Sequence, residues 1–317
     1  MVDALIPPVS TRPDVLPTER LLPNGMLQPE LRSPMRKIEN LRNALSVLSL
    51  WVAVAVLVGA ATQLNRWWVV LIVFVLMGPM HVRFAILMHE AAHRLLFTSK
   101  RANDLVGTWL IASPALVPLS LYRRSHMAHH RKEFGPEEPD LAFYGGYPCK
   151  PNDLRRRLTR DAVGISGWKN LRSLLRALKT RPGQKVAGPI IGVQLVLWSV
   201  MWIASGAWWA YPLLWLAPWM TQWRVLNRLR ALGEHGGMDA SDDRRATTHN
   251  VEQHAFARFW FVPYNTGWHL AHHVDMGVPF RKLPEFHAEL ERAGYVTKEM
   301  TFSSYTALWR ACTSADR

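Results

Sequence analysis

Long stretches without a single charged side chain constrain this chain more than any other feature. No Lys, Arg, Asp or Glu occurs between Arg42 and Arg66, or anywhere from Val186 to Trp223. An α-helix needs about 20 apolar residues to cross a hydrocarbon core. Apolar strands of soluble proteins, by contrast, run for only about 4–8 residues between turn signals. These stretches therefore predict helices that span a membrane.

We expect four transmembrane helices, at about 44–64, 67–88, 186–205 and 207–226. A shorter apolar run at 105–121 is broken by Pro114 and Pro118, and it is better interpreted as an interfacial or re-entrant segment. The predicted fold is an all-α integral membrane protein with four transmembrane helices. A cytoplasmic helical cap, which carries a histidine-rich site, completes it.

The N-terminal part of the chain is rich in proline and has no span of its own. Its prolines are Pro7, Pro8, Pro13, Pro17, Pro23, Pro29 and Pro34. We therefore expect the first 34 residues to be an extended tail. The predicted domain division is a Pro-rich cytoplasmic tail over residues 1–42 and a membrane domain over residues 43–317.

The distribution of basic residues predicts the orientation. Lys and Arg are frequent ahead of the first span and between the second and third, whereas the link between the first two spans has only Arg66. Short basic loops stay in the cytoplasm, so both termini and the middle region are expected there, in an inner or plasma membrane. This topology and the attraction of anionic membrane lipids account for the net charge of +14. No nucleic-acid partner is expected.

Only two cysteines occur, Cys149 and Cys312. They are too few for an iron–sulfur cluster or a zinc ribbon, and their spacing does not indicate a disulfide framework.

Histidine is abundant, and eight of the thirteen histidines fall into three short groups. The groups are His89 and His93; His126, His129 and His130; and His269, His272 and His273. Spacings of three and four residues place each group on one face of a helix. The predicted topology puts all three groups on the cytoplasmic side. Converging imidazoles predict a metal site.

Eight imidazoles exceed the four to six ligands of one ion, so we expect two metals. Imidazole suits iron, zinc and copper alike, so the ligand type leaves the metal open. His235, just after the last predicted span, is a candidate ninth ligand. Four carboxylates are candidates for orienting the ligand imidazoles: Glu90, Glu234, Asp140 and Asp275.

The remaining histidines have simpler interpretations. His81 lies inside the second predicted span, where it either has a function or bonds to a neighbouring backbone group. His249, His254 and His287 are interpreted as surface residues, so His249→Ala should be nearly silent.

The three groups read HEAAH, HMAHH and HLAHH, and this set resembles the membrane-bound fatty acid desaturase superfamily, which includes hydroxylases and ketolases. The resemblance extends from about His81 to Pro284 and includes Glu138-Pro139-Asp140, Glu234-His235 followed by Thr247-Thr248, and Pro263-Tyr264-Asn265. The sequence differs from the motifs of many family members at two positions, and these differences leave the subfamily open. Glu90 lies within the first group, and Ala231 stands where some acyl-CoA desaturases have an Asn.

The resemblance implies a di-iron centre that faces the cytoplasm and activates O2 as co-substrate. It makes His89, His93, His126, His129, His130, His269, His272 and His273 iron ligands and catalytic residues, with His235 as a ninth iron ligand. The implied reaction introduces a double bond into the fatty acyl chain of a lipid. The chain contains no His-Pro-Gly-Gly segment typical of cytochrome b5, so the two electrons are expected from a separate ferredoxin or cytochrome.

Three alternatives remain open on the sequence. The same di-iron scaffold could insert oxygen, as in a lipid hydroxylase or carotenoid ketolase. HEAAH also matches the HExxH pattern of an intramembrane zinc protease with Glu90 as general base, although this leaves the other two groups unexplained. A membrane metal-binding or transport protein is the non-enzymatic alternative, but transporters place ionisable sites at the bilayer midplane.

Overall fold

The computed structural model describes residues 4–13 and 18–314, which form two compact units. The membrane unit comprises Glu39–Arg123 and Arg156–Asn227. The histidine-rich unit comprises the described residues of Met1–Ile38, Arg124–Arg155 and Arg228–Arg317. Three helices contribute residues to both units: α5 (Leu119–Arg131), α7 (Pro151–Ala162) and α11 (Gln222–His235).

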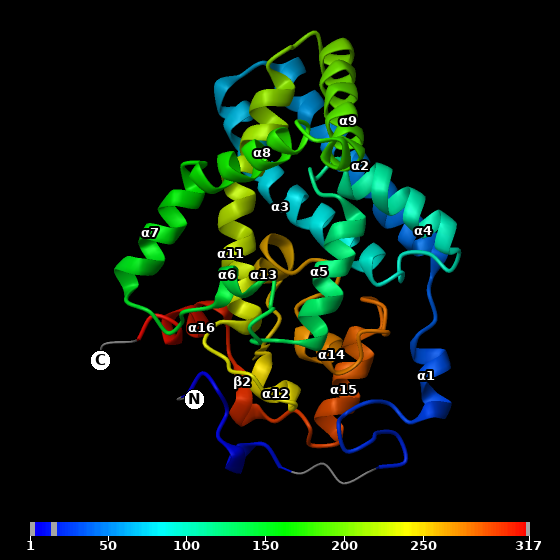
Figure 1. Ribbon diagram of the computed structural model, residues 1–317, viewed down its shortest axis with the longest axis vertical. Coiled ribbons are helices and arrows are strands. Elements are labelled where there is room, and N and C mark those ends of the chain that lie inside the picture. Colours follow the sequence, from blue (N-terminus) through cyan, green and yellow to red (C-terminus); the bar gives the residue numbers. More distant parts are fainter. Residues whose placement is uncertain (1–3, 14–17, 315–317) are drawn as a thin grey trace. The chain divides into compact units, whose positions relative to one another are not determined.

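Within the described residues, three helices are long and apolar enough to cross a membrane, and all three belong to the membrane unit. They are α2 (Asn40–Leu64), α3 (Trp67–Ala92) and α9 (Arg181–Ser205). They confirm the first three predicted spans as helices and extend them. Helices α2 and α3 pack against each other (Figure 1). Left-handed residues follow two of the helices, Asn65 (φ 45°) after α2 and Gly206 (φ 69°) after α9.

The fourth predicted span, 207–226, is not one continuous helix. It consists of a π-helical segment η3 (Pro212–Leu216), helix α10 (Ala217–Met220) and the start of α11. Pro212 and Pro218 lack the backbone donor that a regular helix needs, and Thr221 leaves the helical region at φ −114° and ψ −81°. The expectation of four uninterrupted spans is therefore corrected, and the fourth crossing stays a prediction.

The apolar run at 105–121 is also broken. It comprises the end of α4 (Lys100–Val106), a π-helical segment η2 (Gly107–Ala112), a turn and the start of α5. Pro118 has no N–H to donate to the carbonyl of Pro114. That carbonyl instead accepts hydrogen bonds from Gln194 Nε2 and Trp215 Nε1, both at 3.3 Å. Side chains of the membrane unit thus satisfy the backbone where proline interrupts the helix.

An aromatic cluster lies in the core of the membrane unit. Trp215 is fully buried, stacks on Trp51 with ring centroids 5.9 Å apart and meets the edge of Phe84 at 5.3 Å. His81 Nε2 lies 3.0 Å from the carbonyl oxygen of Trp215. Of the two interpretations of His81, the structure shows the backbone hydrogen bond.

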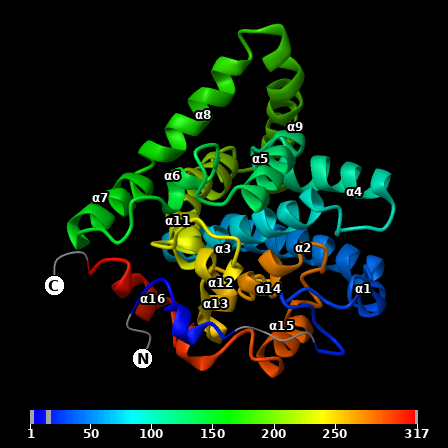
Figure 2. The same cartoon turned by 60° about the horizontal axis from the view of Figure 1, so that its bottom comes forward.

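The histidine-rich unit is built from short elements. Its helices are η1 (Val9–Thr11), α1 (Pro29–Met35), α6 (Leu141–Tyr144), α12 (Arg244–Thr247), α13 (Ala255–Trp260), α14 (His269–Val274), α15 (Leu283–Arg292), η4 (Lys298–Met300) and α16 (Tyr305–Ala311). Strands β1 (Asn250–Val251) and β2 (Thr301–Phe302) pair in parallel, with Asn250 opposite Thr301. Figure 2 shows α14 beside α15, against which it packs. Cys149 and Cys312 are both buried, and neither is part of a disulfide in the described residues.

The N-terminal segment is not an extended tail where the structure describes it. Leu21 and Leu27 are buried and form a β-bridge with each other. Arg36 donates to the buried carboxylate of Asp275 at 2.7 Å, and Arg20 donates to Glu289 at 2.9 Å. Buried leucines and these ion pairs hold the segment against the rest of its unit, so the expectation of an extended tail is corrected. Residues 14–17 lie outside the described residues.

Helix α8 (Ile165–Ala177) approaches α10 closely at one glycine. A Cβ atom on Gly167 would lie 2.2 Å from the carbonyl oxygen of Met220, which no real Cβ contact allows. By contrast, a Cβ atom on Gly192, in α9, would have open space around it. Helix packing therefore requires glycine at position 167 but not at position 192.

We expect Gly167→Ala to destabilise the protein by roughly 1–3 kcal/mol, because the added methyl group must push two helices apart. Gly192→Ala is the matched control, and it should be neutral or stabilising by about 0.5–1 kcal/mol because alanine favours a helix over glycine. The thermal unfolding midpoints of both variants in detergent provide the measurement. Equal midpoints would show that α8 does not pack on α10 as described.

Candidate metal centre

The nine predicted imidazoles are divided between the two units. His89 and His93 lie in the membrane unit, and the other seven lie in the histidine-rich unit. His89 is buried near the end of α3, His93 follows as its C-cap, and their ring centroids are 4.7 Å apart. The structure thus brings the members of the first histidine group together, and their role as ligands stays a prediction.

The second and third groups lie on helices, as their spacing predicts. His126, His129 and His130 belong to α5, and His269, His272 and His273 belong to the short helix α14. Two consecutive left-handed residues, Tyr264 (φ 56°) and Asn265 (φ 63°), turn the chain shortly before α14. The Pro263-Tyr264-Asn265 segment that was noted in the sequence is therefore the turn that positions the third group.

Two groups of imidazole nitrogens form within the histidine-rich unit. In the first imidazole group, Nε2 of His130 lies 3.1 Å from Nε2 of both His126 and His272. In the second, Nε2 of His269 lies 3.1 Å from Nε2 of His235 and 3.0 Å from Nε2 of His273. His129 joins this second imidazole group, because its ligand atom lies within 4.8 Å of those of His235 and His273.

Hydrogen bonds to the outer ring nitrogens determine the tautomers of two members of the second imidazole group. His235 Nδ1 lies 2.8 Å from the carbonyl oxygen of Thr247, and His273 Nδ1 lies 2.5 Å from Glu133 Oε1. Both partners can only accept, so each Nδ1 carries the proton and, in a neutral ring, each Nε2 carries a bare lone pair. These lone pairs point toward His269 Nε2, an arrangement that a shared cation would stabilise.

The geometry and the protonation state both fit a metal ion. Two imidazole nitrogens bound at roughly 2.1 Å to one ion, and about 90° apart, lie ~3.0 Å from each other. Burial, together with the charge of His273, lowers the pKa of His235 and His269 well below the usual value near 6.5. Neutral imidazole is the form that binds metals. The residues present therefore fit a metal site.

Carboxylates orient these imidazoles, although only some are those the sequence suggested. Glu138 Oε2 lies 3.1 Å from His129 Nδ1, and Asp140 is close to both. Glu234 Oε1 lies 3.5 Å from His269 Nδ1, and its predicted role in orienting a ligand stays a prediction. Buried carboxylates beside the outer ring nitrogen are the usual support of a histidine ligand.

Glu90 and Asp275 differ from this pattern. The described partners of Asp275 are Arg36 and the N–H of Gly277, so its carboxylate anchors the N-terminal segment. Glu90 is buried in α3, and its orienting role stays a prediction.

Sequence reasoning missed Glu133 and Tyr144. Glu133 accepts from His273 and from Arg244 Nη1, each at 2.5 Å, and Arg244 Nη2 also donates to the carbonyl oxygen of His130. Its closeness in sequence to His130, just past the end of α5, is a signal that could have found it. Tyr144 Oη lies 3.2 Å from His129 Nδ1, and no sequence pattern indicates this contact.

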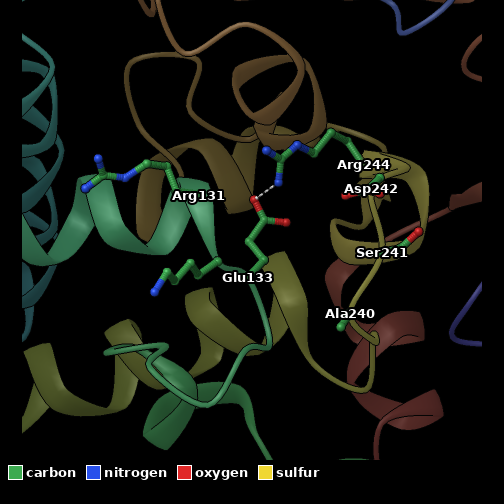
Figure 3. Close-up of a pocket in the computed structure, with 7 residues that line it drawn as sticks. Arg131, Glu133, Ala240, Ser241, Asp242 and Arg244 are labelled. Carbon is green, nitrogen blue, oxygen red and sulfur yellow. Dashed lines mark hydrogen bonds and ion pairs between the residues drawn. The ribbon is translucent and has the colours of Figure 1, made fainter.

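Figure 3 shows Glu133 at a polar pocket of about 370 Å³. Arg131 and Lys132 line the pocket from one side, and the other side is lined by Ala240, Ser241, Asp242 and Arg244. Burial raises the pKa of Glu133, but the charges of His273 and Arg244 outweigh this effect and hold that pKa well below its usual range. Glu133 is therefore a fixed negative charge between this pocket and the second imidazole group.

Two of the three histidines interpreted as surface residues are buried. His249 Nε2 lies 2.7 Å from the carbonyl oxygen of Gly236, and His287 is buried in α15 beside Glu291. His254 is exposed, as predicted. Apolar neighbours such as Phe302, distant in sequence, bury His249, which the local pattern could not reveal. The expectation that His249→Ala is silent therefore loses its basis.

Comparisons with known proteins agree with the geometry. The fatty acid desaturase family model matches residues 65–305. The chain is 26% identical over 239 residues to dihydrorhizobitoxine desaturase from Bradyrhizobium elkanii, covering 69% of this chain and 67% of that protein. It is 22% identical over 287 residues to the sn-1 acyl-lipid omega-3 desaturase (ferredoxin) from Nostoc sp. (strain 36), covering 82% and 78%.

The chain belongs to the fatty acid desaturase family, and it is an oxidoreductase. This confirms the resemblance that the three histidine groups carry. It also sets aside the zinc protease and the transport protein as classes, because both lie outside the family.

Replacing Glu133 tests its support of His273. We expect Glu133→Ala to lower metal content or activity roughly 10- to 100-fold, as loss of such outer partners commonly does. Glu137→Ala is the matched control, since the exposed Glu137 pairs with Lys132 at the surface. Bound metal per chain, measured by elemental analysis, is the readout. Unchanged metal and turnover in Glu133→Ala would contradict the assignment.

His249 should make stability depend on pH. Burial lowers its pKa to about 4 although the hydrogen bond to Gly236 opposes this effect, whereas the unfolded chain binds the proton near 6.5. The contribution of His249 to the free energy of unfolding is therefore complete above pH 6.5. It falls by about 1.4 kcal/mol per pH unit as the pH drops toward 4.

The matched comparison for this effect is His249→Gln, which cannot titrate, against His254→Gln on the surface. Chemical unfolding in detergent measures the free energy of unfolding between pH 7 and pH 4. This free energy should decline less steeply with falling pH for His249→Gln than for the wild-type protein and His254→Gln. Identical slopes in all three proteins would count against a buried, neutral His249.

Proposed function

We propose that this protein is an O2-dependent di-iron lipid desaturase that introduces a double bond into a fatty acyl chain. The observation that carries the proposal is the convergence of two groups of buried imidazoles, with bare Nε2 lone pairs on His235 and His273 in the second. The proposed iron ligands are His89, His93, His126, His129, His130, His235, His269, His272 and His273. Two groups suit two metals better than one.

Iron at this site would supply the chemistry that amino-acid side chains lack, namely O2 activation strong enough to remove hydrogen from an unactivated acyl C–H bond. The overall reaction converts a CH2–CH2 unit, O2, two electrons and two protons into a CH=CH unit and two molecules of water. Burial lowers the pKa of His235, His269 and His273 and so favours their neutral form. The fold also brings Nε2 atoms of both imidazole groups close together. Glu133, Glu138 and the carbonyl of Thr247 accept from the outer ring nitrogens and so orient the rings.

The names of the relatives support desaturation over oxygen insertion. Both are desaturases, and one acts on the sn-1 acyl chain of a lipid with ferredoxin named beside it. An acyl-lipid substrate and a separate ferredoxin or cytochrome as electron donor are part of the proposal. Oxygen insertion by the same scaffold, as in a hydroxylase or ketolase, is the second outcome that product analysis distinguishes.

The proposal includes a location in an inner or plasma membrane. Basic residues at one end of the candidate spans favour a cytoplasmic position for both termini and for the metal site. The helices α2, α3 and α9 support a membrane protein by their length and apolar composition.

Iron content is the first test of this function. Protein expressed with iron and purified without chelator should contain about two irons per chain, and it should convert a lipid to a desaturated product when a reductant and O2 are supplied. One zinc and no iron would contradict the proposal. Two irons per chain together with a hydroxylated product would support the proposed metal site and would show that the reaction is hydroxylation and not desaturation.

His129→Ala and His272→Ala test the two imidazole groups separately. Each should abolish turnover and lower bound iron while leaving membrane insertion intact, because each removes one proposed ligand. The matched control is His254→Ala, which removes an exposed imidazole and should change neither iron content nor turnover. Full activity in either ligand variant would contradict the assignment of its group.

A further inference from the structure

A basic helix lies at the beginning of the third candidate span. Helix α8 carries Lys169, Arg172 and Arg176 and no acidic residue. Three residues, 178–180, separate α8 from α9, and the two helices meet at this short turn (Figure 2). Basic residues next to a span gather where the chain meets the lipid headgroups. Helix α8 therefore belongs at a bilayer surface.

A pocket of about 490 Å³ follows one face of α8. The wall from α8 includes Ile165, Trp168, Lys169 and Arg172, which recur at helical spacing and so share a face. Ala217, Met220 and Thr221 form part of the opposite wall. All of these residues belong to the membrane unit. The pocket has apolar walls, and two cations lie among the residues that line it.

Within residues 4–13 and 18–314, Lys169 and Arg172 form no ion pair with a carboxylate. The acidic residue nearest to them in sequence, Asp161, is buried and accepts a hydrogen bond from Ser166 at 2.5 Å. Exposed Trp168 and Ile165 extend the apolar surface beside the cations. Lys and Arg stems can lie along such a surface while their charged ends meet an anion. The pocket is therefore complementary to a ligand that has both an anionic and an apolar part.

We propose that this pocket binds one anionic phospholipid of the surrounding membrane. The phosphate lies between Lys169 and Arg172, and an acyl chain follows Ile165, Trp168 and Met220. A free phosphate would leave the apolar walls unused, and a zwitterionic or neutral lipid would leave the two cations uncompensated. The proposal is independent of the function proposed above, because it uses no residue of the candidate metal centre.

Native mass spectrometry of the purified full chain tests the site. The protein is equilibrated with an equal mixture of dioleoylphosphatidylglycerol and dioleoylphosphatidylcholine, and retained lipids are counted. We expect one preferentially retained phosphatidylglycerol, and we expect Lys169→Gln/Arg172→Gln to lower that preference by roughly tenfold or more.

Arg176→Gln/Lys179→Gln is the matched control, because it removes the same charge from the same stretch of chain outside the pocket lining. It should keep the preference for phosphatidylglycerol. Equal loss in both double variants would overturn the site in favour of a diffuse electrostatic attraction. No preference in the wild-type protein would overturn it as well.

Two further arms test the apolar wall. Ala217→Phe, which fills the pocket and leaves the cations in place, should lower the retention of phosphatidylglycerol by a similar factor. Inorganic phosphate at millimolar concentration should not displace the lipid from the wild-type protein. Displacement by phosphate alone, or full retention in Ala217→Phe, would show that the cations act without the pocket and would overturn the proposal.

Discussion

Buried imidazole nitrogens that lie 3.0–3.1 Å apart are the constraint on which the histidine-rich unit depends. A neutral imidazole carries one proton, and in the second imidazole group acceptors outside the group hold it on Nδ1 of His235 and His273. The lone pairs of His235 Nε2 and His273 Nε2 both face His269 Nε2, which can donate at most one proton and so leaves at least one lone pair uncompensated. A cation compensates it, which is why the arrangement is typical of a metal site and not of a packed core.

The carboxylate of Glu133, which orients one of these imidazoles, is itself held in place by a neighbouring side chain. Arg244 donates to Glu133 and to the backbone of His130, so a single side chain ties the end of α5 to the carboxylate that orients His273. Glu133 is buried, and a buried charge without partners would be costly. The ion pair with Arg244 and the hydrogen bond from His273 therefore both stabilise Glu133 and limit where the third histidine group can lie.

The membrane unit follows a different physical rule. Its long helices need no polar partners, because each satisfies its own backbone hydrogen bonds within the segment. Where proline interrupts a helix, side-chain donors replace the missing bonds, as Trp215 and Gln194 do for the carbonyl of Pro114. The interrupted region around 207–226 also supplies one wall of the pocket beside α8, so the irregular backbone of the unit creates a binding surface.

Much of this organisation can be predicted from residue order. The uncharged stretches predict α2, α3 and α9, because the length of an apolar run is a local property. The spacing of the three histidine groups places each on one helical face, as α5 and α14 show. Their motifs also predict the family, which the match over residues 65–305 shows.

Contacts between distant residues had to come from the tertiary structure. Glu133 meets His273 across 140 positions, and His249 is buried against Phe302, so neither environment has a local signature. The docking of Arg36 on Asp275 likewise depends on a partner far along the chain. Local periodicity determined which side chains share a face, whereas the tertiary fold determined which faces meet, because helix spacing has a short range and packing does not.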